Sequence, residues 1–397
     1  MKPIYLDHNA TTLMEQGTLS ALLFHSSSVA QIADSAPTFG NPSSIHSAGR
    51  AAKAAVDQAR DALAAALGLG DPDSICFTGS ATESINTALK GFFFYHQKEG
   101  RKVHFLSSVV EHEATLESLR FLEEMGAKVE LLPVNSRGEL SLEALKKSLD
   151  AIPSDAAKMV TLLAANNETG VVFPWEEAAR IANASGASFH LDGVQALGKL
   201  PGFSLKNQPV DFASFSAHKM GGPKGVGALV VRKGAKISSF VHGGAQERKR
   251  RAGTVNVAGI AAFGAAAAAL ADRDLTRVDR MRAGLEAQVK ERIPGAGVQG
   301  AGAARLVNTS NFLFDGVRGE GLVMGLDLEG FAVSSGSACN SGSILPSHVL
   351  LAMGLDKLAA QSAIRVSLSP HNSEEELKLF VDALERVVGR IRSLAHK

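Results

Sequence analysis

Apolar residues in the first two-thirds of the chain gather in short runs, separated by longer stretches of mixed polarity. Several runs, such as "MVTLLA" and "ALVVR", are continuously apolar rather than alternating. Runs of this kind are typical of strands that are covered on both faces of a sheet. The strands predicted in this way are Ser74–Thr78, Val103–Val109, Val129–Pro133, Met159–Ala164, Phe189–Asp192, Phe212–Phe215 and Ala228–Arg232.

The stretches between these strands have the spacing of helices. In the clearest one, from Ser44 to Leu67, small and apolar residues recur three and four positions apart. Pro42–Ser43–Ser44 opens this helix and the pair Gly68 and Gly70 closes it. Strands that alternate with helices predict an α/β fold with a mostly parallel, seven-stranded sheet covered on both faces.

The pattern changes after about residue 260, where helical stretches dominate. We therefore predict a large domain over residues 15–260 and a smaller α+β domain built from residues 1–14 and 261–397. The elements predicted for the second domain are helices at Asp272–Arg292 and Glu374–Leu394, and strands at Asn311–Phe314 and Ala363–Leu368.

The composition is that of a globular protein, with 397 residues, 45% hydrophobic residues and a net charge of +1. This charge gives no general attraction for nucleic acid or acidic membranes, and we expect neither as a partner. Val255–Ala271 is uncharged but mostly Ala and Gly, so it predicts an interior helix and not a membrane span. Two cysteines and a start without an apolar signal core predict a cytoplasmic protein.

The stretch "SFSAHKMGGPKGVG" places Lys219 directly after an apolar strand. Open α/β sheets bind their ligands at the carboxyl ends of the strands. A partly buried lysine at such a position can form a Schiff base with a carbonyl compound. The structural alternative is a solvated loop lysine.

Three further stretches supply the other parts of a pyridoxal phosphate site. Asp192 ends the strand in "HLDGVQ", and an aspartate beside the pyridine nitrogen makes the cofactor ring an electron sink, although Asp192 could also cap a helix. "FTGSATES" is a strand, a small-residue turn and a helix start, which suits an anion, although Gly79–Ser80 could also form an ordinary turn. His112 in "EHEA" stands at another strand-to-helix junction, where a capping or core histidine is the alternative.

The two cysteines differ in their surroundings. Cys76 in "SICFTG" is flanked by apolar residues, which predicts a structural cysteine that behaves as a small hydrophobe. Cys339 in "SSGSACNSGS" has mainly Ser and Gly around it, which predicts a loop thiol that is free to react. An incidental surface thiol is the alternative for Cys339.

Together these stretches resemble the cysteine desulfurases, in the class V aminotransferase group of fold-type I pyridoxal phosphate enzymes. The loop from Cys339 to Pro346 resembles the nitrogen-fixation and housekeeping iron–sulfur branch of that family. The chain departs from the family at Gly79–Ser80, where Ser-Gly is commoner, and at Ala245, where a third glycine is common. The stretches that carry the resemblance, in family order, are "YLDHNATT", "FGNPSS", "FTGSATES", "EHEATL", "NNETGVV", "HLDGVQALGKLP", "SFSAHKMGGPKGVGAL", "HGGAQERKRRAGT", "SSGSAC" and "AIRVSLS".

The resemblance implies a role for each matching residue. Lys219 would hold the cofactor covalently, and Asp192 would pair with its ring nitrogen. Arg365, with Asn41, would bind the substrate carboxylate, a task that suits a bidentate guanidinium. No metal site is predicted. The further cofactor contacts implied are stacking by His112, hydrogen bonds to the ring from Asn167 and Gln195, phosphate contacts from Ala81, Thr82, Ser216 and His218, and a contact from Thr254 to the partner's phosphate in a homodimer.

The implied reaction converts L-cysteine into L-alanine and leaves the sulfur as a persulfide on Cys339, for an acceptor such as an iron–sulfur scaffold protein. One alternative is a selenocysteine lyase or another lyase or aminotransferase of the same group, and Cys339 is the residue that discriminates. A non-catalytic binding protein is a second alternative, which the presence of Lys219, Asp192 and Arg365 disfavours. The basic run Arg248–Arg251 is interpreted as part of the active site or of an interface, not as a nucleic-acid patch.

Overall fold

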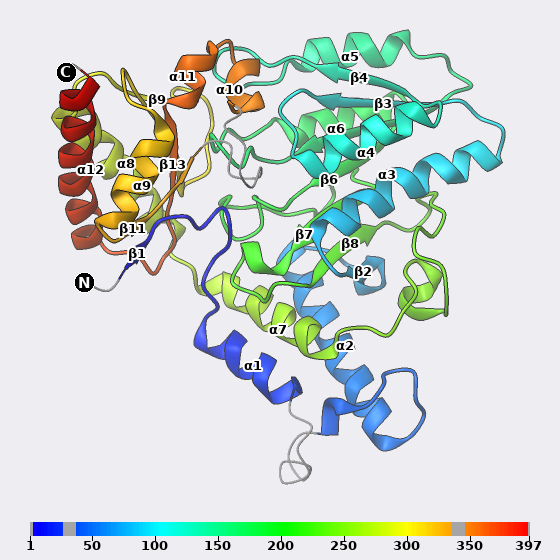
Figure 1. The fold of residues 1–397 in the computed structure, drawn as a ribbon. Coiled ribbons are helices and arrows are strands. Elements are labelled where there is room, and N and C mark those ends of the chain that lie inside the picture. The colour runs from blue at the N-terminus through cyan, green and yellow to red at the C-terminus, as the bar shows by residue number, and fades with distance from the viewer. Residues whose placement is uncertain (1–2, 27–36, 336–345, 396–397) are drawn as a thin grey trace.

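The structure is a computed structural model that describes residues 3–26, 37–335 and 346–395. A sheet of seven strands forms its larger part, in the order β2-β8-β7-β6-β5-β3-β4 (Figure 1). All seven strands predicted from the sequence are present. Their bounds are β2 (Ile75–Thr78), β3 (Val103–Ser108), β4 (Lys128–Leu132), β5 (Ala157–Leu163), β6 (Ser188–Asp192), β7 (Phe212–Ser216) and β8 (Gly227–Val231).

The sheet is mostly parallel, as predicted. Strands β4, β3, β5, β6 and β7 run in the same direction, and β8 runs antiparallel to both of its neighbours, β7 and β2. Residues 217–226 join β7 directly to β8 without a crossover helix, and such a direct connection requires an antiparallel pair. This connection carries Lys219.

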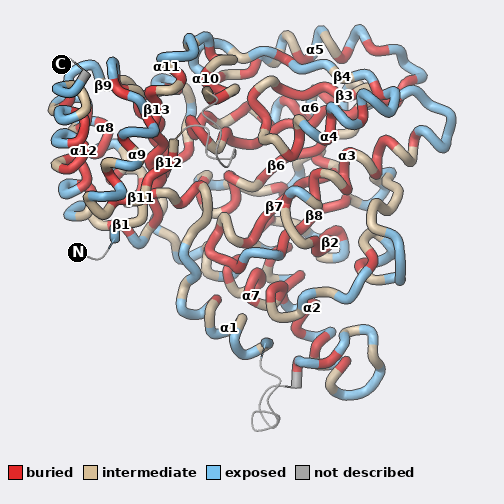
Figure 2. Tube along the Cα trace, in the orientation of Figure 1, coloured by how far each residue is buried: buried red, intermediate tan, exposed pale blue. Residues whose placement is uncertain are grey.

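Helices cover both faces of this sheet, and buried residues follow its strands (Figure 2). Side chains alternate between the two faces along each strand. On β3, for example, Phe105 packs with the helices of one face and Leu106 with those of the other. The first face is covered by α3 (Ala81–Lys98) and α4 (Glu113–Glu124), and the second by α2 (Ser47–Leu67), α5 (Leu142–Ala151), α6 (Trp175–Ala184) and α7 (Val257–Ala268).

A second core lies around a four-stranded antiparallel sheet of order β12-β13-β10-β9. The N-terminal strand β1 (Ile4–Tyr5) pairs with β11 (Phe331–Ala332), so the first residues of the chain join this part. The exact domain boundaries stay a prediction. The elements of this part are β9 (Ala296–Val298), β10 (Thr309–Phe314), β12 (Ser334–Ser335), β13 (Ala363–Ser367), α8 (Leu275–Arg292), α9 (Gly319–Leu328) and α12 (Glu374–Ala395).

The structure differs from the sequence prediction at a few boundaries. Helix α2 begins at Ser47 and not at Ser44, because the Nδ1 atom of His46 accepts the N–H of Gly49 at 3.3 Å and caps the helix. The stretch Val255–Ala271 does form an interior helix, α7, and no helix within the described ranges is long and apolar enough to cross a membrane. The remaining helices of more than one turn are α1 (Gln16–Ser26), α10 (His348–Ala352) and α11 (Lys357–Gln361).

Candidate active site

A cavity of about 280 Å³ lies where the parallel strands β6 and β7 end and the helices α3 and α4 begin. Its size is close to the lower end of the range of about 300–1,000 Å³ that is usual for ligand pockets. Ten residues that the sequence analysis selected line it together: Ala81, Thr82, His112, Asn167, Asp192, Gln195, Ser216, His218, Lys219 and Arg365.

Lys219 ends the short 3-10 turn that follows β7. Its Nζ atom donates hydrogen bonds to two backbone carbonyl oxygens, that of Asn9 at 2.7 Å and that of Ala10 at 2.8 Å. Both carbonyls belong to the "YLDHNATT" stretch near the N-terminus. Sequence reasoning quoted this stretch for the resemblance but gave it no role, because a backbone carbonyl leaves no signal in the sequence.

Asp192 is the last residue of β6 and is buried. Its Oδ1 atom accepts the N–H of Val194 at 3.0 Å, so it stabilises the turn that follows the strand. Burial raises the pKa of Asp192 to about 6, against the lowering effects of the Val194 N–H and of Lys219. A positive charge beside this carboxyl would favour its ionised form, which is what a pyridinium nitrogen would supply.

His112 fits both interpretations of the sequence, as a helix-capping histidine and as a residue of the cofactor site. Its Nδ1 atom accepts the N–H of Ala114 at 3.0 Å and caps α4, while the residue also lines the cavity. Since Nδ1 accepts this bond, a neutral ring carries its proton on Nε2. Burial, assisted by the charge of Lys219, lowers the pKa of His112 and favours that neutral ring.

The first turn of α3 forms one end of the cavity. Ser80 caps the helix by accepting the N–H of Glu83 at 3.1 Å, and Ala81 and Thr82 follow it. The N–H groups of a first helical turn have no partner within the helix, so this end suits a phosphate group. A side chain at Gly227 of β8 would lie 2.5 Å from the Ser80 carbonyl carbon, so glycine is needed where the strand passes behind this turn.

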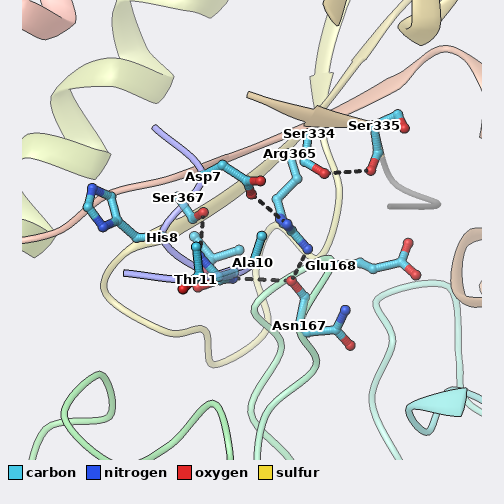
Figure 3. Close-up of polar contacts among 12 residues, drawn as sticks. Asp7, His8, Ala10, Thr11, Asn167, Glu168, Ser334, Ser335, Arg365 and Ser367 are labelled. Atoms are coloured by element: carbon cyan, nitrogen blue, oxygen red, sulfur yellow. Dashed lines mark hydrogen bonds and ion pairs between the residues drawn. The ribbon is translucent and has the colours of Figure 1, made fainter. Parts of the chain in front are cut away.

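Arg365 enters the cavity from β13, on the second sheet, and is only 3% exposed (Figure 3). Its Nη2 atom donates to Oδ1 of Asp7 at 2.6 Å, and its Nη1 atom donates to the backbone oxygen of Asn167 at 3.1 Å. The buried Nε atom has no hydrogen-bond partner among the described residues. The guanidinium is therefore held in place and keeps a donor for a further acceptor.

Gln195 belongs to a buried polar cluster beneath Lys219. Its Nε2 atom donates to the Asn9 carbonyl oxygen at 3.2 Å, and its Oε1 atom accepts from Nζ of Lys199 at 2.5 Å. Burial lowers the pKa of Lys199 well below its usual value. Sequence reasoning missed Lys199, although a lysine between the apolar residues of "ALGKLP" is a signal that could have indicated it.

Two predicted residues lie outside this cavity. Asn41 is exposed and lines a second cavity of about 270 Å³, together with Gln246, Arg248 and Val255. Thr254 is also exposed and stands next to Val255 in the chain. Within this single chain neither residue reaches the cavity of Lys219.

Cys339 lies outside the described residues, but the chain on both sides of its segment flanks the cavity. Before the segment, Ser334 of β12 pairs with Arg365 of β13. After it, Ser347 donates a hydrogen bond from Oγ to Oε2 of Glu168 at 2.5 Å, and Nε2 of His348 lies 3.0 Å from the carbonyl oxygen of Glu111. Glu168 and Glu111 are sequence neighbours of Asn167 and His112, which line the cavity.

The structure also shows the surroundings of Cys76 and of the basic run Arg248–Arg251. Cys76 is completely buried, and burial raises the pKa of its thiol to about 12, as expected of a structural cysteine. The basic run Arg248–Arg251 folds back on the protein: Arg248 pairs with Asp73, and Arg251 pairs with Glu83.

A lysine after a strand, a buried carboxyl at the end of the neighbouring strand and a helix N-terminus around one cavity define a fold-type I pyridoxal phosphate enzyme. The family model described as aminotransferase class-V matches residues 4–380. A curated relative named cysteine desulfurase IscS, from Dictyoglomus turgidum, is 39% identical in an alignment of 399 positions. The alignment covers 99% of this chain and 96% of that protein.

Solved structures agree with this match. One described as a NifS-like protein is 36% identical, with a TM-score of 0.86 over 98% of this chain and 100% of that one. Another, described as SspA in complex with cysteine, is 31% identical, with a TM-score of 0.78 over 93% of this chain and 100% of that one. The chain therefore belongs to the aminotransferase class-V family and, within it, to the cysteine desulfurases, which are pyridoxal phosphate enzymes.

Proposed function

We propose that this enzyme removes sulfur from L-cysteine, releases L-alanine and holds the sulfur as a persulfide on Cys339. One observation carries the proposal: Lys219 and Arg365 line the same cavity, and the chain on both sides of the Cys339 segment flanks it. Pyridoxal phosphate, when bound, supplies an electron sink for the charge that develops at the substrate Cα.

The residues of the cavity divide the work. Arg365 binds the substrate carboxylate, and its unpartnered Nε–H and its charge suit that task. When the cofactor is bound, Lys219 would hold its carbonyl carbon through Nζ and, when free, would move a proton at the substrate Cα. Asp192 would stabilise the charged ring nitrogen, and the neutral ring of His112 would contact the cofactor ring. The cofactor contacts that complete this assignment are Asn167 and Gln195 at the ring, and Ala81, Thr82, Ser216 and His218 at the phosphate.

The sulfur transfer needs no external oxidant or reductant. The thiolate of Cys339 attacks the substrate sulfur and forms a sulfur–sulfur bond. The bond from sulfur to Cβ breaks, its electron pair stays on carbon, and protonation of that carbon gives the methyl group of alanine. One cysteine and one enzyme thiol thus become one alanine and one enzyme persulfide. A sulfur-acceptor protein, such as an iron–sulfur scaffold, then takes the sulfur from Cys339.

We propose further that the enzyme is a homodimer in which Thr254 completes the partner's cofactor site. Large apolar side chains are exposed near Asn41: Phe39 is 62% exposed and Ile45 is 91% exposed. Leu23 and Phe24 of α1 are exposed as well, at 59% and 44%. A second copy of the chain would cover these side chains, since exposed apolar groups of this size mark interaction sites.

The test is alanine release from L-cysteine in the presence of a reductant. We expect alanine from the intact protein, almost none from Cys339→Ala and nearly normal release from Cys76→Ala, the matched variant of the other cysteine. Alanine release that survives in Cys339→Ala would contradict the role of the thiol. If none of the proteins releases alanine while amino acids still change the absorbance of the cofactor, a different reaction on the same cofactor replaces the desulfurase.

A further inference from the structure

Glu83 occupies an unusual position at the start of α3, directly after Ala81 and Thr82. The sequence "SATE" has the form of a capping box, in which the glutamate side chain accepts a backbone N–H at the start of the helix. Here Oε2 of Glu83 accepts the N–H of Gly79 at 2.8 Å, while Ser80 accepts the N–H of Glu83. A Cβ at Gly79 would lie 2.9 Å from the same oxygen, so glycine admits the carboxylate to this turn.

The carboxylate of Glu83 also binds Arg251, which lies far away in the sequence. Nε of Arg251 donates to Oε1 at 2.7 Å and Nη2 donates to Oε2 at 3.3 Å, so the pair is two-pronged. The side chains of Arg251 and Glu83 are only 22% and 20% exposed. Bidentate pairs of this kind are among the stronger ion pairs, and the hydrogen bond that Arg251 donates to Glu83 raises the pKa of Arg251.

The position of Glu83 creates an electrostatic problem that Arg251 solves. The proposed phosphate site uses the positive end of α3, and an unpaired carboxylate in the same helical turn would repel the phosphate. We infer that Glu83 and Arg251 form a positioning pair for the cofactor phosphate: Glu83 shapes the turn of Gly79 and Ser80, and Arg251 cancels the charge of Glu83. This inference rests on the proposed function, because it assumes that Ala81 and Thr82 bind a phosphate.

Arg251 can be replaced without releasing the segment that carries it. The carboxylate of Glu247 binds Arg60 through two hydrogen bonds of 3.0 and 2.9 Å, and it also accepts the N–H of Phe77 at 2.7 Å. Nη1 of Arg250 donates to the carbonyl oxygen of Asp73 at 2.8 Å. These contacts hold the residues before Arg251, so its substitution removes the charge next to Glu83 and leaves the chain in place.

The test measures the binding of pyridoxal phosphate and of pyridoxal, which lacks the phosphate, to the full-length protein after its cofactor is removed. Bound cofactor is followed by its visible absorbance, in wild type, Arg251→Gln, Glu83→Gln and the double variant. Arg180→Gln, which breaks an exposed ion pair with Glu177, is the matched control.

We expect Arg251→Gln to weaken the binding of pyridoxal phosphate about tenfold, which is within the range of interaction energies between residues in contact. Glu83→Gln should stay within about twofold of wild type, because the amide oxygen can still accept the N–H of Gly79, and the double variant should recover most of the loss. Pyridoxal binding should be the same in all proteins, and Arg180→Gln should match wild type.

Two results would overturn the inference alone. One is that Arg251→Gln weakens the binding of pyridoxal phosphate equally in wild type and in the Glu83→Gln variant. The other is that Arg251→Gln weakens the binding of pyridoxal and of pyridoxal phosphate equally. A wild-type protein that binds pyridoxal with the same affinity as pyridoxal phosphate would contradict the phosphate site itself. In that case the proposed function loses its cofactor site and the inference falls with it.

Discussion

Replacing Arg365 by lysine tests how the substrate is bound. The guanidinium is a planar fork that donates hydrogen bonds to Asp7 through Nη2 and to the Asn167 carbonyl oxygen through Nη1. Its buried Nε–H has no partner among the described residues. A lysine ammonium is a single point charge on a flexible chain and cannot reproduce this fork. Arg365→Lys keeps the positive charge in the cavity but gives up at least one of the directed contacts.

The expected loss follows from the contact that the lysine cannot make. One hydrogen bond to a charged group contributes about 1.5–3 kcal/mol. Since about 1.4 kcal/mol corresponds to a factor of ten, kcat/KM for L-cysteine should fall by about 10- to 150-fold. We expect most of the change in KM, because the carboxylate does not react and is bound equally in the ground state and the transition state.

The assay is the rate of alanine formation against L-cysteine concentration, together with the absorbance of the bound cofactor and the melting temperature. Arg277→Lys is the matched control, since Arg277 also makes two hydrogen bonds through its fork, to the carbonyl oxygens of Pro370 and Asn372. A KM of Arg365→Lys within about twofold of wild type, with normal cofactor absorbance, would refute the reasoning. Arg365 would then serve only to fix Asp7 and Asn167.

Two further predictions concern stability and assembly. Glu111 is fully buried and burial raises its pKa to about 8, so the stability that this group contributes is present below pH 4.5 and is lost as the pH rises through 8. Glu111→Gln removes this dependence, so the melting temperature of the variant relative to wild type should rise from pH 5 to pH 8. The corresponding change in relative unfolding free energy is on the order of a few kcal/mol. A difference in melting temperature that stays constant with pH would contradict the raised pKa of Glu111. Ile45→Glu places a charge on the proposed dimer surface and should shift sedimentation toward the monomer, whereas Leu328→Glu, at another residue that is 86% exposed, should not; an unchanged dimer would exclude this surface as the interface.

The strands were predictable because of where the sheet lies. Helices cover it on both faces, so several of its strands are continuously apolar, and this pattern is visible without knowledge of the partner strands. The start of α2 was predicted three residues too early because its cap is His46, which is not one of the usual capping residues. Strand β9 was not predicted, since its stability comes from pairing with β10 and not from its own composition.

The candidate site was predictable where a residue type at the end of a strand indicates its chemistry. Lys219 and Asp192 are of this kind, and the resemblance supplied the rest. Asp7 could not be assigned, because it binds a guanidinium 358 positions away in the sequence. The partners of Lys199 could not be assigned for the same reason, since Asn9 lies 190 positions from it. No local spacing carries that information.

The N-terminal segment therefore does more than pair with β11. Strand β1 pairs with β11 in that part of the protein, and the next residues cross to the larger one. Within four positions, Asp7 binds Arg365 of β13 (Figure 3), and the carbonyls of Asn9 and Ala10 accept hydrogen bonds from Lys219 after β7. Lys219 and Arg365 stand on different sheets, so their separation would otherwise depend on how the two sheets pack. A continuous stretch of backbone that contacts both limits this separation, because covalent geometry sets the greatest distance that four residues can span.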